Sequence, residues 1–269
     1  MAFRKEKYSV TLLKGDGIGP EVIDATTTVV DTALNRFGGG LAYRPFHAGA
    51  NYYAQTGYDL EPGAEKSIEQ TDAILLGAIG LPDVRDKNGT EISPHLRIRE
   101  QLGLYAGVRP VKAYANGPQM LADERASQID LVILRESSEG LFYTAAVHDR
   151  NLVCNDHEVT ETLRITRSTT EKLHDFAFKL ARRRQEKKGR SANALVSCVD
   201  KANVFRSMAF FRQIFKERAK AHPDIDVSFH YVDALALDLI RRPWDFDVLV
   251  MENMFGDIMS DLAGGLVGG

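Results

Sequence analysis

The sequence predicts an α/β fold. Short apolar runs alternate along the chain with segments whose apolar residues recur at helical spacing, and this alternation is typical of a sheet covered by helices. The chain has 269 residues, of which 44% are hydrophobic, so it can bury a substantial core as one large domain or two modest ones. No low-complexity linker or fixed-period repeat interrupts the pattern.

The predicted elements follow one another in a regular order. Six apolar runs are predicted as strands: residues 10–13, 73–79, 129–136, 193–200, 227–232 and 247–251. Helices are expected from Pro20, over residues 203–221, up to Arg242 and after Met251. The stretch from Glu139 to about Leu163 shows neither pattern, and we expect β-rich excursions there.

The charge balance argues against a general role in binding nucleic acids or anionic membranes. The chain has 34 Lys and Arg against 37 Asp and Glu, a formal charge of -3, so it carries no broad basic field. The concentrated basic run at residues 182–188 ends a predicted helix, where the helix dipole favours cations.

The cysteines and the apolar segments favour a cytoplasmic protein. Neither Cys154 nor Cys198 stands in a metal-type spacing such as C-x-x-C, so a reducing cytosol is the simplest setting. The start, MAFRKEKYSVTLLKGDG, has only a short apolar run before a charged loop, and no apolar segment of transmembrane length occurs. We expect no contact with a membrane.

The loop KGDGIGPE, residues 14–21, is the first candidate for chemistry. Its glycines stand at Gly15, Gly17 and Gly19, a spacing that differs from the G-x-G-x-x-G dinucleotide fingerprint. On these residues alone the loop is a tight turn into a helix N-terminus, and a phosphate cradle is the alternative.

Three arginines and two strand ends supply further candidates. Arg99 lies in LRIREQ, Arg109 in GVRPVK and Arg135 in LRESSEG. Since a guanidinium binds a carboxylate in bidentate fashion, three of them together would suit a di- or tricarboxylate, although each alone is consistent with an ordinary ion pair. Lys201 and Asp233 stand at strand ends, where ligands of open α/β sheets gather.

Asp257 and Asp261 allow two interpretations. An acidic residue in a first helical turn is favoured by the helix dipole, which would make the pair structural. Positions i and i+4 also place two carboxylates on one helix face, a suitable half-site for a divalent ion that prefers oxygen ligands. The pair alone does not decide between them.

Seven motifs in a fixed order decide the question: GDGIGPEV, LLGAIG, LYAGVRP, RESSEG, VDKANV, YVDALALDL and ENMFGDIMSDL. Together they resemble the β-decarboxylating dehydrogenases, the family of isopropylmalate, isocitrate, homoisocitrate and tartrate/malate dehydrogenases. The resemblance runs from about Val10 to Gly269. It implies two α/β domains around a central cleft, with residues 1–104 in a cofactor-side domain, 105–255 in a dimerisation and substrate domain, and 256–269 returning into the first.

The resemblance also implies a site shared by two copies of a homodimer. The three arginines would bind the substrate carboxylates. Asp257 and Asp261 would hold Mg²⁺ or Mn²⁺ together with Asp233 of the second copy, and Lys201 of that copy would reach the same site.

For the nicotinamide cofactor, NAD or NADP, the resemblance implies binding by Ala78, Ile79, Gly80 and Asn253. The implied reaction needs the divalent ion, the lysine and the nicotinamide together. A divalent ion on the substrate hydroxyl lowers its pKa, and a lysine beside that ion can take the proton as hydride leaves for the nicotinamide. The resulting β-keto acid then loses carbon dioxide while the ion stabilises the developing negative charge.

The end of the chain differs from the family pattern. Members continue through a loop of the type HGSAPDIAG, which embraces the adenosine half of the cofactor and completes the first domain. We therefore expect a chain truncated at its C-terminus, with an incomplete first domain and no activity on its own.

Substrate identity stays open between the branches of the family. His95 stands where the residue facing the distinguishing substituent is apolar in isopropylmalate dehydrogenases and typically Asn in isocitrate dehydrogenases, and Ser93 matches a serine of the isocitrate enzymes. We favour an isopropylmalate-type enzyme, in leucine biosynthesis, over isocitrate and tartrate/malate dehydrogenases. A non-catalytic regulatory paralogue is the alternative from another class, but such paralogues usually lose part of the arginine, lysine and aspartate set, which is kept here.

One position departs from the family. Seven residues after the arginine of the RE motif most members carry a tyrosine that protonates the enolate, whereas here that place is Phe142, followed by Tyr143. If the segment is extended, neighbouring side chains point to opposite faces, so Tyr143 could serve only through a bulge. We expect Phe142 to line the cleft, with the proton coming from water or Lys201; Tyr143 as the acid is the alternative.

Overall fold

The computed structural model describes residues 5–146, 152–189 and 194–269, which form two compact units, Met1–Ile98 and Arg99–Gly269. Helix α4 (Pro94–Gln101) contains the boundary between them. The domain limits expected at residues 104 and 255, and the return of 256–269 into the first domain, stay predictions.

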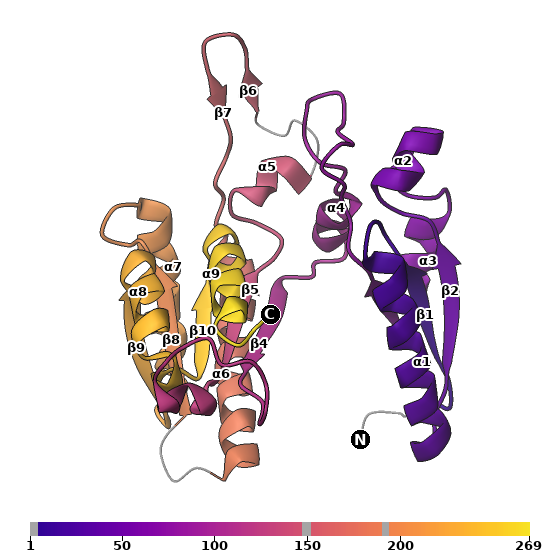
Figure 1. The fold of residues 1–269 in the computed structure, drawn as a ribbon. Helices are drawn as coiled ribbons and strands as arrows, with labels where there is room; N and C mark the ends of the chain where they lie inside the picture. Colours follow the sequence, from indigo (N-terminus) through magenta and orange to yellow (C-terminus); the bar gives the residue numbers. More distant parts are fainter. Residues whose placement is uncertain (1–4, 147–151, 190–193) are drawn as a thin grey trace. The chain divides into compact units, whose positions relative to one another are not determined.

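The first unit is built on a parallel sheet in the order β2-β1-β3, drawn in indigo and purple in Figure 1. Its elements before α4 are β1 (Tyr8–Leu13), α1 (Gly19–Phe37), β2 (Leu41–Phe46), α2 (Ala50–Thr56), α3 (Ala64–Gln70) and β3 (Ala73–Leu76). Strand β3 ends at Leu76, earlier than the apolar run predicts, and the N–H of Gly77 makes one more hydrogen bond to β1, at the Leu13 carbonyl (2.8 Å).

The second unit contains a five-stranded sheet in the order β4-β5-β10-β8-β9, in which β4 alone is antiparallel to its neighbour. Its strands and 3₁₀ segments are β4 (Ala106–Lys112), η1 (Glu124–Gln128), β5 (Asp130–Glu136), β8 (Ala194–Asp200), β9 (Ile225–Tyr231), η2 (Pro243–Asp245) and β10 (Val248–Met251). Its helices are α5 (Phe142–Ala146), α6 (Arg167–Lys188), α7 (Arg206–Ala219), α8 (Val232–Arg241) and α9 (Asn253–Gly265). A small hairpin of β6 (Val153–Cys154) and β7 (Val159–Thr160) completes it.

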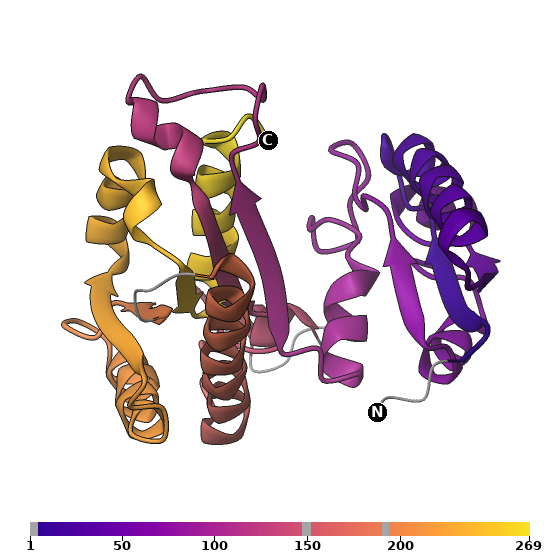
Figure 2. The ribbon, with the colours of Figure 1, turned by 90° about the horizontal axis from the view of Figure 1, so that it is seen from below.

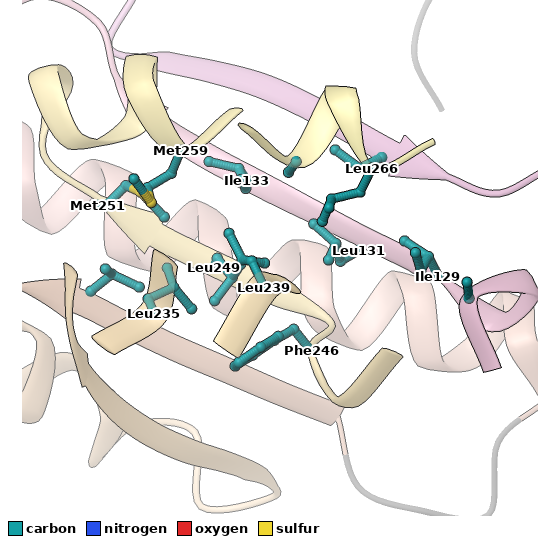
Figure 3. Close-up of a cluster of buried hydrophobic side chains, with 14 residues drawn as sticks. Ile129, Leu131, Ile133, Leu235, Leu239, Phe246, Leu249, Met251, Met259 and Leu266 are labelled. Carbon is teal, nitrogen blue, oxygen red and sulfur yellow. The ribbon is translucent and has the colours of Figure 1, made fainter. Parts of the chain in front are cut away.

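The central strands of this sheet are buried on both faces, and Figure 2 shows α6 and α7 on one side and α8 and α9 on the other. Side chains of a strand alternate between faces. Leu131 and Ile133 of β5 therefore join the cluster under α8 and α9, shown in Figure 3, whereas Val132 and Leu134 join the cluster under α6 and α7. This alternation explains why β5 reads as a continuous apolar run.

The six strands and four helices expected from the apolar patterns are present, and α6 ends with the basic run at residues 182–188 as expected. Strands β2 and β4 were not predicted, because their side chains are largely half-buried or exposed and form no apolar run. Of the stretch from Glu139 to Leu163, residues 147–151 lie outside the described residues, and the described part has the helix α5 and one pair of two-residue strands, so there the expected β-rich excursion is largely wrong. No helix in the described ranges is both long and apolar enough to cross a membrane.

Candidate active site

Two of the predicted arginines share one face of the second unit's sheet. In the antiparallel pair of β4 and β5, Gly107 lies opposite Arg135 and Arg109 lies opposite Ile133. Opposite residues of a strand pair point to the same face, and so do residues two apart. Arg109 and Arg135 therefore lie on the face that helix α9 covers.

Electrostatic coupling shows that Arg99 joins them. Burial lowers the pKa of the Arg135 guanidinium, the carboxylate of Asp257 raises it, and the positive charges of Arg99 and Arg109 lower it. Burial likewise lowers the pKa of Arg99, which Arg109 lowers further and Asp257 raises. The buried Glu136 also raises the pKa of Arg135. Since arginine remains charged in proteins, three cations gather around Asp257, an arrangement that suits an anion with more than one negative group.

Arg135 is fixed by the residues around it. It is 3% exposed, its Nε donates to Oδ1 of Asn253 (2.8 Å), and its Nη1 forms an ion pair with Asp257. Nδ2 of Asn253 in turn donates to the Glu139 carbonyl (2.8 Å), and the guanidinium lies 4.9 Å from the ring centroid of Phe142. Both ends of the Asn253 amide are thus used inside the protein, and its role toward a cofactor stays a prediction.

Helix α9 approaches β5 at a glycine. A Cβ on Gly256 would lie 2.6 Å from Cβ of Arg135 and 2.9 Å from its Cα, closer than packed atoms allow. Because Asp257 is the next residue along α9, this close approach brings its carboxylate within reach of the arginine.

The start of α9 removes the helix-dipole interpretation of the two aspartates. Glu252 caps the helix, its Oε2 accepting hydrogen bonds from the amides of Met254 (3.1 Å) and Phe255 (3.3 Å). The first turn contains no acidic residue, so Asp257 and Asp261 lie beyond it. The sequence did not single out Glu252, although a carboxylate directly before a helix is a common capping signal.

Lys201 and Asp233 lie together at the carboxyl ends of two parallel strands. Lys201 follows β8 and Asp233 is the second residue of α8, directly after β9. Nζ of Lys201 donates to Oδ1 of Asp233 (2.6 Å), and this hydrogen bond lowers the pKa of the aspartate. The Asp233 side chain is 67% exposed and can therefore meet another molecule.

Asp200, the last residue of β8 and the neighbour of Lys201 in the chain, was missed by the sequence analysis. It is fully buried, accepts two hydrogen bonds from the guanidinium of Arg212 (2.7 and 2.8 Å), and accepts a third from the amide of Ala202 (2.8 Å). Asp200 belongs to the motif VDKANV, whereas Arg212 lies outside it on α7, so the pair was not visible in the motif.

The carboxylates fit a divalent ion in part. Among the described residues, no group of three or more His, Cys, Asp and Glu lies close enough to hold a metal ion. Asp257 and Asp261 supply two hard oxygen donors one turn apart on an accessible face of α9, which matches what Mg²⁺ or Mn²⁺ prefers. Asp233, the third expected ligand, pairs with Lys201 of its own chain.

Helix α4 carries His95 in the first unit. The carbonyl of Ser93 accepts the Leu96 amide (3.1 Å) at the start of the helix. Arg97, which the sequence analysis passed over, forms bidentate hydrogen bonds with Asp59 (2.9 and 3.3 Å) and so anchors α4 to the segment after α2. The substrate-selecting roles of His95 and Ser93 stay predictions.

The segment Ala78 to Gly80 follows β3 in the first unit. Its backbone lies against the loop of residues 14–19, where a Cβ on Gly15 would lie 1.9 Å from the Ala78 carbonyl oxygen. The first glycine of the loop therefore permits close backbone packing.

Phe142 and Tyr143 lie on a helix, so the expectation of an extended segment is wrong. Successive residues of a helix point about 100° apart, and the two rings have different partners. Phe142 stacks on Arg135, whereas the ring of Tyr143 lies 4.7 Å from the Arg164 guanidinium. The source of the enolate proton stays a prediction.

Fold and site together define an α/β protein with an arginine-lined, cationic site beside the carboxyl ends of parallel strands. The chain belongs to the isocitrate/isopropylmalate dehydrogenase family, whose sequence profile matches residues 9–269. By family it is an oxidoreductase, as the resemblance of the seven motifs implied.

Relatives and solved structures agree with this assignment. The chain is 39% identical to a 3-isopropylmalate dehydrogenase of Heyndrickxia coagulans, covering 97% of this chain and 70% of that protein. The corresponding enzyme of Aquifex aeolicus is 35% identical, over 98% and 71%. The structure of an isocitrate dehydrogenase from Methylococcus capsulatus has a TM-score of 0.81 at 32% identity, over 97% and 71%. A β-decarboxylating dehydrogenase from Thermococcus kodakarensis has a TM-score of 0.70 at 31% identity, over 97% and 69%.

Proposed function

We propose that this protein catalyses the oxidative decarboxylation of a 2-hydroxy di- or tricarboxylate, with 3-isopropylmalate as the preferred substrate and NAD as the hydride acceptor. The observation that carries the proposal is the placement of Arg109 and Arg135 on the sheet face that α9 covers, with Arg135 paired to Asp257 and the charge of Arg99 acting on the same group. Three guanidinium groups at one place bind two carboxylates of one small molecule and fix its orientation.

The arginines differ in how freely they can meet a ligand. Arg135 is buried and held by Asn253, so it offers a fixed donor, whereas Arg109 is exposed and Arg99 half-buried. Binding a carboxylate replaces part of the pairing between Arg135 and Asp257, which frees the Asp257 carboxylate for a cation.

Asp257 and Asp261 would hold Mg²⁺ or Mn²⁺ with Asp233 of a second copy of the chain. The bound ion would lower the pKa of the substrate hydroxyl and stabilise negative charge on the same oxygen, and NAD would accept the hydride. Lys201 of the second copy takes the hydroxyl proton through Nζ, with Asp233 orienting it as it does in this structure. With the site divided in this way, the active form would be a homodimer.

The choice of substrate rests on the relatives. Those with the highest similarity reported above are named 3-isopropylmalate dehydrogenases, which favours a place in leucine biosynthesis, whereas isocitrate, tartrate and malate are the alternatives. His95 and Ser93 on and before α4 would select among them. NAD would bind along Ala78, Ile79 and Gly80 and near Asn253, and NADP is the alternative. We place the enzyme in the cytoplasm.

The relatives also suggest which molecule to assay. This chain spans about 70% of the length of the relatives reported above. We propose that NAD binding needs the part of these relatives that this chain does not cover. The 269-residue chain alone would therefore be inactive. A cooperative melt together with micromolar NAD binding by this chain alone would contradict that.

The experiment is an activity assay of the complete gene product. Nicotinamide reduction and carbon dioxide release are followed with 3-isopropylmalate, isocitrate, tartrate and malate, each with Mn²⁺ and either NAD or NADP. We expect turnover with 3-isopropylmalate and its loss when the ion is chelated. Substrate binding without any turnover would instead indicate a regulatory paralogue.

A further inference from the structure

A buried carboxylate in the first unit has no role in the site described so far. Asp16, in the loop between β1 and α1, is 1% exposed and forms no ion pair among the contacts of the described residues. A buried charge is costly unless hydrogen bonds compensate it, so its partners indicate what it does.

Three backbone amides from two other segments bind this carboxylate. Oδ2 accepts from Ala50 (2.7 Å) and Gly80 (2.9 Å), and Oδ1 accepts from Asn51 (2.8 Å). Ala50 and Asn51 begin α2, whereas Gly80 ends the segment proposed to bind the cofactor. Asp16 thus joins three parts of the chain that are distant in sequence.

The backbone of Asp16 holds the same segment from its other end. The Asp16 amide donates to the Ala78 carbonyl (2.7 Å), so one residue binds the C=O of Ala78 and the N–H of Gly80. Gly80 has φ +111°, a conformation that residues other than glycine rarely adopt. A side chain on Gly49 would collide with Asp16, since its Cβ would lie 2.2 Å from Oδ2.

We propose that Asp16 is a positioning residue that sets the backbone of residues 78–80 in its cofactor-binding conformation before the cofactor arrives. The proposal rests on the proposed function for the assignment of that segment. The Ala78 carbonyl and the Gly80 amide both bind Asp16. The backbone N–H and C=O of Ile79 and the carbonyl of Gly80 are therefore the groups of this segment that we assign to the ligand.

The carboxylate is needed because all three partners are donors. Asparagine has almost the same shape, but it has one acceptor oxygen, and its NH₂ group would face an N–H group. Asp16→Asn therefore loses at least one of the three bonds without leaving a cavity. Asp16→Glu restores the charge with a longer side chain that does not fit the same three donors.

The first experiment needs no variant. Hydrogen–deuterium exchange of the complete gene product is followed on fragments covering residues 78–82, with and without NAD. If Asp16 sets the segment in advance, the Gly80 amide is protected without NAD, and NAD changes its exchange rate by less than about threefold. Free exchange without NAD and protection only with NAD would overturn the proposal.

The second experiment compares Asp16→Asn with a matched control. Asp72 also accepts bonds from another segment of the first unit, the amide and hydroxyl of Ser9 (2.8 and 2.9 Å), but at the opposite end of β1 and β3. We expect Asp16→Asn to raise the Kd for NAD at least tenfold by calorimetry and to speed exchange at residues 78–82. Asp72→Asn should leave both within twofold, and substrate affinity should be unchanged in both variants.

The outcomes separate this inference from the function on which it rests. If the wild type binds no NAD, the proposed function fails, and the exchange rates alone decide whether Asp16 holds the segment. If the wild type binds NAD and folded Asp16→Asn binds it equally well, the positioning role is refuted and the proposed function stands. If Asp72→Asn weakens NAD binding as much as Asp16→Asn does, the effect comes from destabilising the first unit as a whole, and the positioning role is refuted.

Discussion

The two units of this chain are held together in different ways. The second buries both faces of a five-stranded sheet between two apolar clusters, and almost all of the largest fully buried side chains in the described residues belong to it, with Leu13 as the exception. The first has a three-stranded sheet, and along its 19-residue helix α1 only Gly19 and Ile23 are buried. Its loops instead interlock through backbone contacts around Asp16.

The difference shows two ways to hold a functional residue in place. In the second unit, apolar packing fixes β5 and α9, which carry Arg135 and Asp257, so the positions of these two residues depend on the apolar core. In the first unit, hydrogen bonds and close glycine contacts fix the segment of residues 78–80 with little apolar support. Changes to apolar side chains should therefore affect the second unit far more than the first.

The largest expected effect tests this contrast directly. Phe215 of α7 is fully buried in the cluster between α6, α7 and the sheet. Phe215→Ala should therefore lower the free energy of unfolding by about 3–5 kcal/mol. Val29 on α1 is 68% exposed, and Val29→Ala should cost less than about 0.5 kcal/mol. Denaturant titrations measure both. A loss from Val29→Ala as large as that from Phe215→Ala would mean that another surface covers α1.

The next effect concerns a buried histidine that only the second unit has. His174 lies edge-on against Phe211 and Phe215 with 0% exposure, and burial lowers its pKa from 6.5 to about 3. The unfolded chain binds this proton and the folded chain does not, so stability falls as pH drops below about 6.5, by up to about 1.4 kcal/mol per unit until about pH 3.

The variant His174→Phe removes this proton and isolates its contribution. Between pH 6 and pH 4 the wild type should lose about 2–3 kcal/mol more stability than His174→Phe. The exposed His157→Phe is the control and should follow the wild type. Parallel curves for wild type and His174→Phe would show that the imidazole can be protonated without unfolding.

A smaller effect on stability distinguishes two glycines of α9, one that packs closely against β5 and one that does not. Gly256→Ala places a methyl group against Arg135 and should destabilise the protein by about 1–3 kcal/mol and weaken substrate binding. Gly264 has no heavy atom within 4 Å of a built Cβ, so Gly264→Ala should stabilise it by about 0.5–1 kcal/mol. If both substitutions stabilise, α9 does not approach β5 as closely as described.

The metal proposal predicts weaker ion binding in a chain that still folds. Replacing Asp257 or Asp261 with Asn in the complete gene product should weaken Mn²⁺ binding well over tenfold, because each removes one anionic oxygen ligand. The unfolding curve of Asp261→Asn should stay close to that of the wild type, since Glu252 and not Asp261 caps α9, whereas Asp257→Asn also loses the ion pair with buried Arg135 and should be less stable. Unchanged Mn²⁺ affinity in Asp257→Asn, measured by calorimetry, would remove Asp257 from the ligand set.

The smallest expected effect concerns the two rings of α5. Tyr143 stacks on Arg164 and not on Arg135, so Tyr143→Phe should be nearly neutral, whereas Phe142→Tyr should leave turnover equal or higher. Steady-state rates of both variants test this. A loss of 100-fold or more in Tyr143→Phe with substrate binding preserved would identify Tyr143 as the acid.

The sequence predicted those parts that depend on local pattern. Buried strands such as β5 and β10 could be predicted because each is a continuous apolar run. The motifs contained Arg109 and Arg135, which lie on one face of the sheet in the structure. The sequence did not predict β4, α5 or the role of Asp16, because these depend on contacts with distant segments. The i, i+4 spacing alone left the role of Asp257 open, and only the resemblance of the seven motifs assigned it to a metal site, an assignment that stays a prediction.

The place of β10 in its sheet has a consequence for how the protein is made. Strand β10 comes last in sequence among the strands of the described residues, yet it lies in the middle of its sheet, between β5 and β8. During synthesis the three described strands of the first unit have all emerged by Leu76, whereas β5 and β8 keep open edges until Met251 leaves the ribosome. The second unit, which is the better packed of the two once complete, is therefore the one that most needs protection from aggregation while the chain emerges.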